Sequence, residues 1–179
     1  MPFLIGAGVV LVLILVWFIS TLNSLKRASI KIDEAMSGID VALTKRYDVL
    51  TKMLDVTKAY AEHEKSTIME TINLRKGMNM QERVEANKKM DEAVGRINMI
   101  AEAYPELRSN ENFKQLQISI TDVEEHLQAA RRLFNGNVSE YNQSVSVFPN
   151  SIVAGMSNMT SKEFFKADEI KRQDVEMKF

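Results

Sequence analysis

Residues 3–22 read FLIGAGVVLVLILVWFISTL, twenty consecutive residues without a charged side chain. A helix of this length spans about 30 Å, which is the thickness of the hydrocarbon core of a bilayer. Because lipid offers the backbone no hydrogen-bond partner, we expect a helix here despite the many β-branched residues. Trp17 and Phe18 lie near its C-terminal end, where aromatic side chains meet lipid headgroups. The stretch predicts a transmembrane anchor over residues 1–25.

A cleaved secretory signal is the alternative interpretation of the same stretch. Such a signal carries basic residues before its apolar run and small residues at the cleavage site. No Lys or Arg precedes residue 26, and the sequence ISTL of residues 19–22 is a poor cleavage site. We therefore expect a retained anchor in a single-pass protein.

The first charged residues after the anchor are basic: Lys26, Arg27 and Lys31 precede Asp33 and Glu34. Cytoplasmic flanks of membrane spans carry an excess of Lys and Arg. We therefore expect a protein of the cell membrane, inner or plasma, with its N-terminus outside and its polar part in the cytoplasm.

The remaining composition excludes several classes of protein. The 23 Lys and Arg nearly balance the 24 Asp and Glu, whereas nucleic-acid binders carry a basic excess. The absence of cysteine excludes disulfides, thiolate metal sites and a cysteine nucleophile. Seven glycines and three prolines leave few turns for a sheet of many strands. The polar part is therefore expected to be helical, without nucleic acid as a partner.

Apolar residues recur at steps of three and four along most of the polar part, which is typical of amphipathic helices. Residues 23–75 contain one glycine and no proline, so one helix is expected to continue from the anchor to Arg75. A second helix is predicted over residues 82–104, ended by Pro105. A third is predicted from a cap at Ser109 or Asn110 to Phe148, just before Pro149, and it is expected to be uninterrupted at Gly136.

Shorter helices are expected after Pro149. Ile152, Val153 and Met156 predict a short segment, and the TSKE sequence of residues 160–163 is a capping box that would open a last helix. The fold class is thus all-α: a transmembrane helix over residues 1–25, an elongated antiparallel bundle over residues 26–170 with three long helices and short C-terminal ones, and a polar tail over residues 171–179.

The helix lengths give an expectation about partners. The polar part of the first helix is about 75 Å long and the second helix about 35 Å. The third helix is expected to start midway and to run away from the membrane again, so these helices leave part of the apolar stripe on the first helix uncovered. The C-terminal segment or a second copy of the chain would then cover it. We expect self-association there, at Ile32, Met36, Ile39 and Leu43.

Three further groups of residues are candidates for contacts. Met78 and Met80 lie in the predicted distal loop and could meet a protein partner. Glu62, His63 and Glu64 form either a weak metal or pH-sensing point or a solvated patch. Arg131 and Arg132 form either an anion or lipid phosphate site or a salt-bridge pair between helices.

No catalytic motif is present in the sequence. His63-Glu64 is not followed by a histidine four positions on, so the zinc-protease helix is missing. Neither His63 nor His126 has a glutamate three residues earlier, which excludes the di-iron bundle motif. We expect no enzyme activity, no cofactor and no resident metal.

Several blocks resemble the LemA family. They are YAEHE from Tyr60, EAYPELRSNENFKQLQ at 102–117, AARRLFN at 129–135, VSEYN at 138–142, VFP at 147–149 and FFKADE at 164–169. Their order and the N-terminal anchor match as well. The resemblance implies a bacterial membrane protein with a transmembrane helix and a long antiparallel helical domain. It implies no established biochemical activity, although some relatives organise internal membranes, including those of magnetosomes.

Two functions follow as hypotheses. The first is a non-catalytic, self-associating scaffold that organises or remodels the membrane, with the lipid bilayer and a second copy as partners. The second is an adaptor in signalling or protein quality control that binds one dedicated protein at the membrane.

Overall fold

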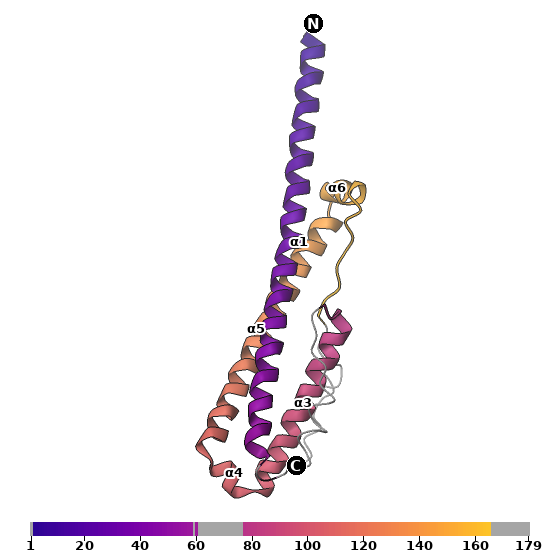
Figure 1. Cartoon of the computed structure of the whole chain (residues 1–179). Helices are drawn as coiled ribbons and strands as arrows, with labels where there is room; N and C mark the ends of the chain where they lie inside the picture. The colour runs from indigo at the N-terminus through magenta and orange to yellow at the C-terminus, as the bar shows by residue number, and fades with distance from the viewer. Residues whose placement is uncertain (1, 59, 61–76, 166–179) are drawn as a thin grey trace, which may run out of the picture. The chain divides into compact units, whose positions relative to one another are not determined.

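The structure is a computed structural model, and it describes residues 2–58, 60 and 77–165. Every element in these residues is an α-helix. In chain order they are α1 (Pro2–Thr57), α3 (Met80–Ala103), α4 (Pro105–Ser109), α5 (Glu111–Ser146) and α6 (Asn150–Met156) (Figure 1). The predicted all-α fold, with a long apolar N-terminal helix and a helical bundle, is confirmed.

The first helix is continuous from the apolar span into the polar part. α1 runs through residues 23–26 without interruption, as the absence of turn residues there predicts, and the helix also continues through Gly38. Its first part is long and apolar enough to cross a membrane. The apolar span and the first helix of the bundle are therefore one continuous helix.

The end of α1 differs from the prediction, because the helix stops at Thr57 and not at Arg75. The Thr57 hydroxyl donates to the Leu54 carbonyl at 2.9 Å, and the Tyr60 amide donates to the Thr57 carbonyl at 2.9 Å, which closes a tight turn. The Tyr60 ring then lies 6.0 Å from the Tyr104 ring, centroid to centroid. No glycine or proline marks this turn, so tertiary packing overrides the local helix propensity.

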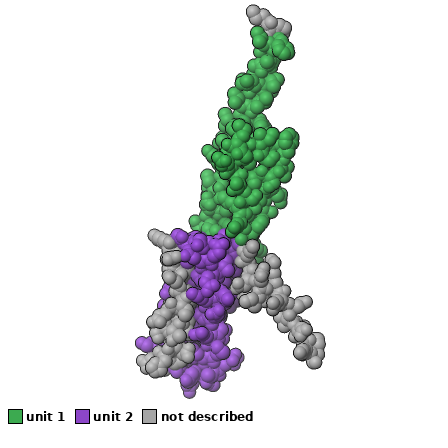
Figure 2. All heavy atoms as spheres, turned by 90° about the vertical axis from the view of Figure 1, so that its right-hand side faces the viewer, with its two compact units in different colours: residues 1–37, 132–164 green, residues 38–131, 165–179 purple. Residues whose placement is uncertain are grey.

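The chain forms two compact units (Figure 2). Unit 1 is residues 1–37 and 132–164, and unit 2 is residues 38–131 and 165–179. α1 and α5 each contribute to both units, because one boundary falls after Ser37 and the other after Arg131.

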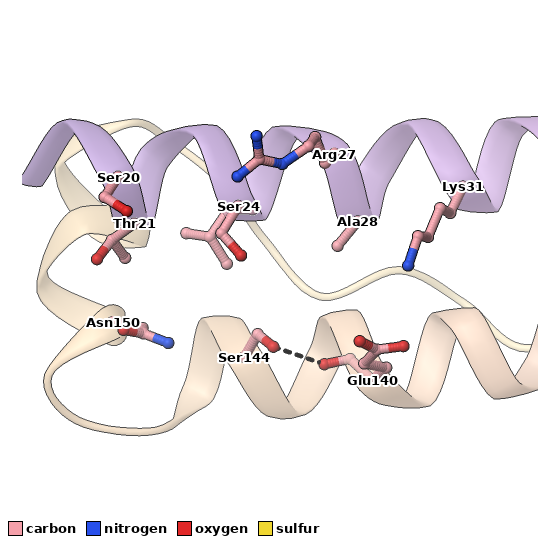
Figure 3. A pocket seen from close by; sticks show the side chains of 10 residues that line it. Ser20, Thr21, Ser24, Arg27, Ala28, Lys31, Glu140, Ser144 and Asn150 are labelled. Atoms are coloured by element: carbon pink, nitrogen blue, oxygen red, sulfur yellow. Dashed lines mark hydrogen bonds between the residues drawn. The ribbon is translucent and has the colours of Figure 1, made fainter.

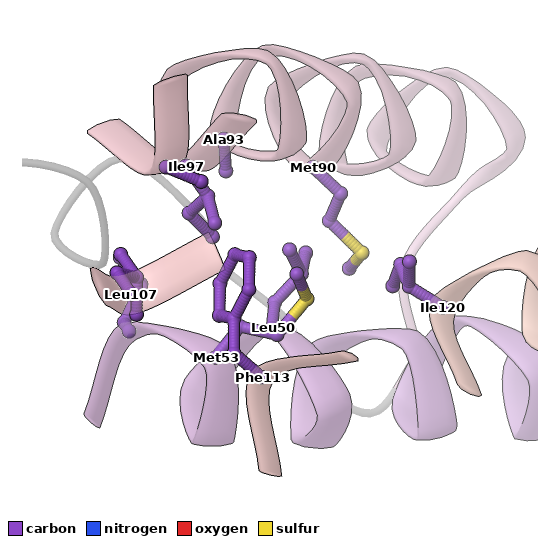
Figure 4. Packing of buried hydrophobic residues seen from close by; sticks show 10 residues of the cluster. Leu50, Met53, Met90, Ala93, Ile97, Leu107, Phe113 and Ile120 are labelled. Carbon is purple, nitrogen blue, oxygen red and sulfur yellow. The ribbon is translucent and has the colours of Figure 1, made fainter. Parts of the chain in front are cut away.

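Unit 2 is built around one apolar core shared by α1, α3, α4 and α5. Phe113 and Ile120 of α5 face Met90 and Ile97 of α3 across it (Figure 4). Each large side chain that is fully buried in this way stabilises the fold by about 1.5–3 kcal/mol. The predicted stripes of the second and third helices supply much of this core. Its buried members are Leu50, Met53, Leu54, Met90, Ala93, Ile97, Ala101, Leu107, Phe113 and Ile120.

Within unit 2, α3 runs in the same direction as α1. Arg83 contacts Asp40, and Arg46 contacts Asn87 and Asp91, at sequence separations of 43, 41 and 45 residues. A nearly constant separation is the mark of parallel neighbours. α1 and α3 are therefore parallel neighbours, and α5 is the antiparallel one.

The ends of α3 and the start of α5 are set by local caps. The Asn79 side chain accepts from the Glu82 amide at 2.9 Å, and the Glu82 carboxylate accepts from the Asn79 amide at 2.8 Å, a complete capping box. Pro105 ends α3 as predicted and becomes the first residue of α4. Asn110, one of the two predicted caps of the third helix, accepts from the Phe113 amide at 3.2 Å.

In unit 1, α5 packs antiparallel to α1 and runs toward the apolar span. The Asn137 side chain donates to the Lys31 carbonyl at 3.0 Å, and later residues of α5 lie beside earlier residues of α1. The expectation that the third helix runs away from the membrane is wrong, because the short α4 reverses the chain before α5 begins. Gly136 lies inside α5, as predicted.

The segment after α6 is extended and not helical. The amide of Lys162 donates to the Asn142 side chain at 2.8 Å, and the same side chain donates to the Lys162 carbonyl at 2.9 Å. This two-point clamp holds the segment against α5. The helix predicted from Thr160 is wrong over the described residues 160–165, because the clamp uses the backbone groups that a helix would need.

Candidate functional site

A polar cavity of about 390 Å³ lies in unit 1 beside the end of the apolar span (Figure 3). Its walls are α1, the C-terminal half of α5 and the first residue of α6. Four hydroxyl groups, two cationic side chains and one carboxylate line it. The lining residues are Ser20, Thr21, Ser24, Leu25, Arg27, Ala28, Lys31, Glu140, Ser144 and Asn150.

The position of the cavity follows from the helical period of α1. Thr21, Leu25 and Ala28 follow one another at steps of three and four, so they share the face of α1 that meets α5. Thr21 and Leu25 are buried there, whereas the span that ends at Leu22 is exposed along most of its length. The cavity therefore begins at the last turn of the span.

The charges around the cavity favour an anion. Arg27 and Lys31 are exposed, and no ion pair within the described part of the chain engages either of them. Glu140 supplies one carboxylate against these two cations. The Ser144 hydroxyl donates to the Glu140 carbonyl at 2.9 Å (Figure 3). Cationic heads beside several hydroxyls are suited to the oxygens of a phosphate group.

Lys162 of the extended segment holds α1 and α5 of unit 1 together. Its Nζ lies 2.9 Å from the Ser29 hydroxyl and 3.4 Å from the Asp33 carboxylate. The same ammonium lies 5.7 Å from the centre of the Tyr141 ring. Burial raises the pKa of the Tyr141 hydroxyl above its usual value of 10.0. None of these contacts was predicted, because they join residues more than a hundred positions apart or rest on the unforeseen clamp.

A second polar cluster lies in unit 2 around Arg46, whose side chain is almost fully buried. Its guanidinium donates to Asn87 at 2.5 Å and to Asp91 at 2.6 Å, and lies 3.0 Å from the Glu124 carboxylate. Gln128 donates to the same glutamate at 2.8 Å. Arg46 therefore joins α1, α3 and α5 through charge-assisted contacts.

Sequence reasoning missed Arg46, although a signal was present. Arg46 lies three residues after Leu43 and four before Leu50, so it interrupts an apolar face. A lone arginine on such a face needs buried partners of opposite charge. A second ion pair, between Arg83 and Asp40 at 2.6 Å, lies beside it along α3 and raises the pKa of Arg83 further.

The membrane-proximal interface predicted on the first helix is largely buried within the chain itself. Ile32, Ile39 and Leu43 are almost inaccessible to solvent, and Met36 is half-buried. The expectation that the chain leaves this stripe uncovered is wrong, because α5 returns along α1. An interface made by these side chains would need them exposed.

The methionine and arginine candidates do not form one site. Met78 is buried and Met80 is half-buried as the first residue of α3. Arg131 lies over the buried Phe165, with 5.0 Å from its guanidinium carbon to the ring centre, in unit 2. Arg132 is exposed in unit 1.

Glu62, His63 and Glu64 lie outside the described residues. Among the residues that the structure describes, no three His, Asp or Glu side chains gather in a way that could hold a metal ion.

Comparisons with known proteins agree with the fold. A model of the LemA family matches residues 35–179. Protein LemA of Metamycoplasma hominis is 27% identical over 164 residues, which is 89% of this chain and 75% of that protein. Magnetosome protein MamQ of Magnetospirillum gryphiswaldense is 29% identical over 73 residues, 41% of this chain and 27% of that protein. Magnetosome protein MamQ 2 of Paramagnetospirillum magneticum is 26% identical over 74 residues, with the same shares covered.

Proposed function

This chain belongs to the LemA family, and from that premise we propose that it is a non-catalytic scaffold that organises or shapes a membrane. The apolar part of α1 and the family membership indicate a membrane-associated protein. The partial similarity to two proteins whose names place them at magnetosomes supports a role at a membrane.

The observation that carries the proposal is the continuity of α1. One helix runs from the apolar span to Thr57, so no hinge separates the bundle from the bilayer. A flexible linker would let a bundle move freely above the surface, whereas a continuous helix passes tilt and rotation directly to the lipid. This mechanical connection supports a role in shaping the bilayer.

Self-association of the scaffold is proposed for exposed surfaces of the bundle. The buried Ile32, Ile39 and Leu43 do not supply those surfaces.

The test is to image the full-length protein in extracted native membrane and in vesicles. A scaffold should form large homo-oligomers or alter membrane shape when overproduced. Asn23→Pro removes an amide donor from α1 directly after the span, and should kink the helix. We expect this variant to lose membrane remodelling while the bundle keeps its circular dichroism spectrum.

Asn23→Ala is the matched control, because alanine preserves the helix at the same exposed position. Remodelling that survives Asn23→Pro with a kinked helix would contradict the role of continuity. A small, homogeneous particle that captures one protein at fixed stoichiometry would instead support the membrane adaptor.

A further inference from the structure

The chain has a second long stretch without charge. Residues 141–161, between Glu140 and Lys162, contain no Asp, Glu, Lys, Arg or His. This stretch includes the end of α5, the bend at Pro149 and all of α6. Outside the N-terminal anchor, the chain is otherwise rich in charge, so this corner differs from the rest of the bundle.

The corner presents a group of exposed apolar side chains. Val147 is 59% exposed, Phe148 76%, Ile152 51% and Met156 71%. We call these four residues the α5–α6 corner. Phe148 was predicted on the buried stripe of the third helix, but α5 ends at Ser146 and Phe148 leaves that stripe.

The corner is a folded feature and not a loose end. Val153 and Ala154 on the other side of α6 are buried. The Ser151 amide donates to the Val147 carbonyl at 3.0 Å, and the Ile152 amide donates to the Pro149 carbonyl at 3.2 Å. The exposed apolar side chains are therefore held outward while α6 packs on unit 1.

The corner lies level with the end of the span. Asn150 of α6 lines the same cavity as Ser20 and Thr21, which are the two residues before Leu22 at the end of the apolar stretch (Figures 1 and 3). When the span crosses a bilayer, this level is the boundary between acyl chains and headgroups. Lys26 follows about 6 Å further along the helix, within the headgroup layer, and Lys31 about 14 Å further, on the aqueous side of that layer.

We propose that the α5–α6 corner is a second membrane contact, inserted into the lipid–water interface beside the anchor. The occupant of this apolar surface is the bilayer itself. Burial of the four apolar side chains in lipid is favourable, and residues 141–161 contain no charged side chain that would have to be desolvated. The proposal rests on the membrane location of the span, which is part of the proposed function.

The absence of cysteine in the chain makes a direct test practical. Single cysteines are introduced by Ile152→Cys in the corner, Leu133→Cys on exposed α5 and Leu15→Cys in the span. Each full-length variant carries an environment-sensitive fluorophore and is reconstituted in phosphatidylcholine–phosphatidylglycerol vesicles. Quenching by brominated acyl chains and by aqueous iodide is then compared.

The label at residue 152 should be quenched by bromine placed near the headgroup, since an interfacial segment inserts about 5–10 Å. Iodide should quench the label at residue 152 severalfold less efficiently than the label at residue 133, which lies on α5 about 20 Å before the end of that helix. A second substitution, Phe148→Asp, should return the label at residue 152 to water.

The label at residue 15 in the span distinguishes a failure of the corner proposal from a failure of the proposed membrane location. If residue 15 is quenched by lipid while residues 152 and 133 are equally accessible to iodide, the corner proposal is wrong and the anchor stands. If residue 15 is itself accessible to iodide, the membrane location in the proposed function fails first. Equal lipid quenching at residues 133 and 152 would also overturn the proposal, because the whole unit would then lie along the bilayer.

Discussion

Removal of Arg46 should destabilise unit 2. In Arg46→Ala, the carboxylates of Asp91 and Glu124 lose their common cation, and Asn87 loses its donor. Breaking a buried pair costs up to about 3–5 kcal/mol, and because both carboxylates retain partial solvent access we expect about 2–4 kcal/mol. Thermal and urea unfolding of the protein in detergent, followed by circular dichroism, measures this loss.

Lys89→Ala is the control for the loss of an ion pair. Lys89 pairs with Glu85 one turn away on exposed α3, at 3.8 Å. Removal of this surface pair should change the free energy of unfolding by less than about 0.5 kcal/mol. Equal effects of the two substitutions would show that the Arg46 cluster contributes no more than a surface pair.

Asn142 should hold the extended C-terminal segment in place. Asn142→Ala leaves the amide and carbonyl of Lys162 without their partner, at a cost of about 1–3 kcal/mol. Because these contacts are local, we expect faster hydrogen exchange over residues 157–165 with a smaller effect on unit 2. Gln143→Ala, at an exposed neighbouring position, should leave exchange unchanged.

Single residues show where sequence reasoning ends. Apolar stripes could be predicted because burial repeats with the helical period, and Met90, Ile97 and Phe113 lie where the period places them. The contacts of Arg46 and Lys162 could not be predicted, because the partners of a polar side chain depend on which helices become neighbours. The cavity was not foreseen for the same reason, although its cations had been noted.

At the scale of elements, α5 is the helix whose buried face is most clearly defined. Ile120 lies in the core of unit 2, and Ile118, two residues earlier, is exposed on the same helix. Ile120→Asp buries a charge without a partner and should unfold the domain or lower its melting temperature strongly. Ile118→Asp should leave melting nearly unchanged, and a similar shift in both variants would refute the assigned face.

The elements differ in how well their ends could be predicted. The start of α5 agrees with the sequence because Asn110 caps it locally, whereas α3 begins at Met80, two residues before the predicted start, because Asn79 caps it. The end of α1 at Thr57 and the lack of a helix over residues 160–165 differ from the prediction, because contacts with residues distant in the sequence determine both. The Tyr60 ring packs beside the Tyr104 ring, and the Asn142 side chain accepts a hydrogen bond from the Lys162 amide.

At the scale of the whole molecule, the direction of the helices was beyond prediction. Periodicity identifies which face of a helix is buried, but a parallel and an antiparallel neighbour bury the same face. Only the structure shows that α3 runs parallel to α1 and that α5 runs antiparallel to it. The burial of Ile32 and Leu43 is likewise known from the structure alone.

The juxtamembrane charges give a prediction for the complete protein in its membrane. Neutralising Arg27 and Lys31 together, as Arg27→Gln with Lys31→Gln, should reduce retention of anionic lipid, since each cation near such a surface contributes about 1 kcal/mol, or about fivefold. Phosphatidylglycerol that co-purifies from mixed vesicles is the measurement. Lys45→Gln with Lys52→Gln removes the same charge from exposed positions of unit 2 and should leave retention unchanged.

Competition with inorganic phosphate identifies the source of the anion. Displacement of the lipid by millimolar phosphate would mean that the cavity selects a free phosphate rather than a headgroup. Equal lipid loss in the two double variants would contradict a specific role of the cavity cations.

The unbroken α1 also fixes the rotational phase between anchor and bundle. One residue inserted before Leu25 would turn every side chain of the span by about 100° relative to Ile32 and lift it by about 1.5 Å. Seven inserted residues would restore the facing to within about 20° but separate the two by about 10 Å. The spacing between span and bundle thus determines which flank of the anchor faces the α5–α6 corner, and any axial rotation of unit 1 is also a rotation of the anchor in the lipid.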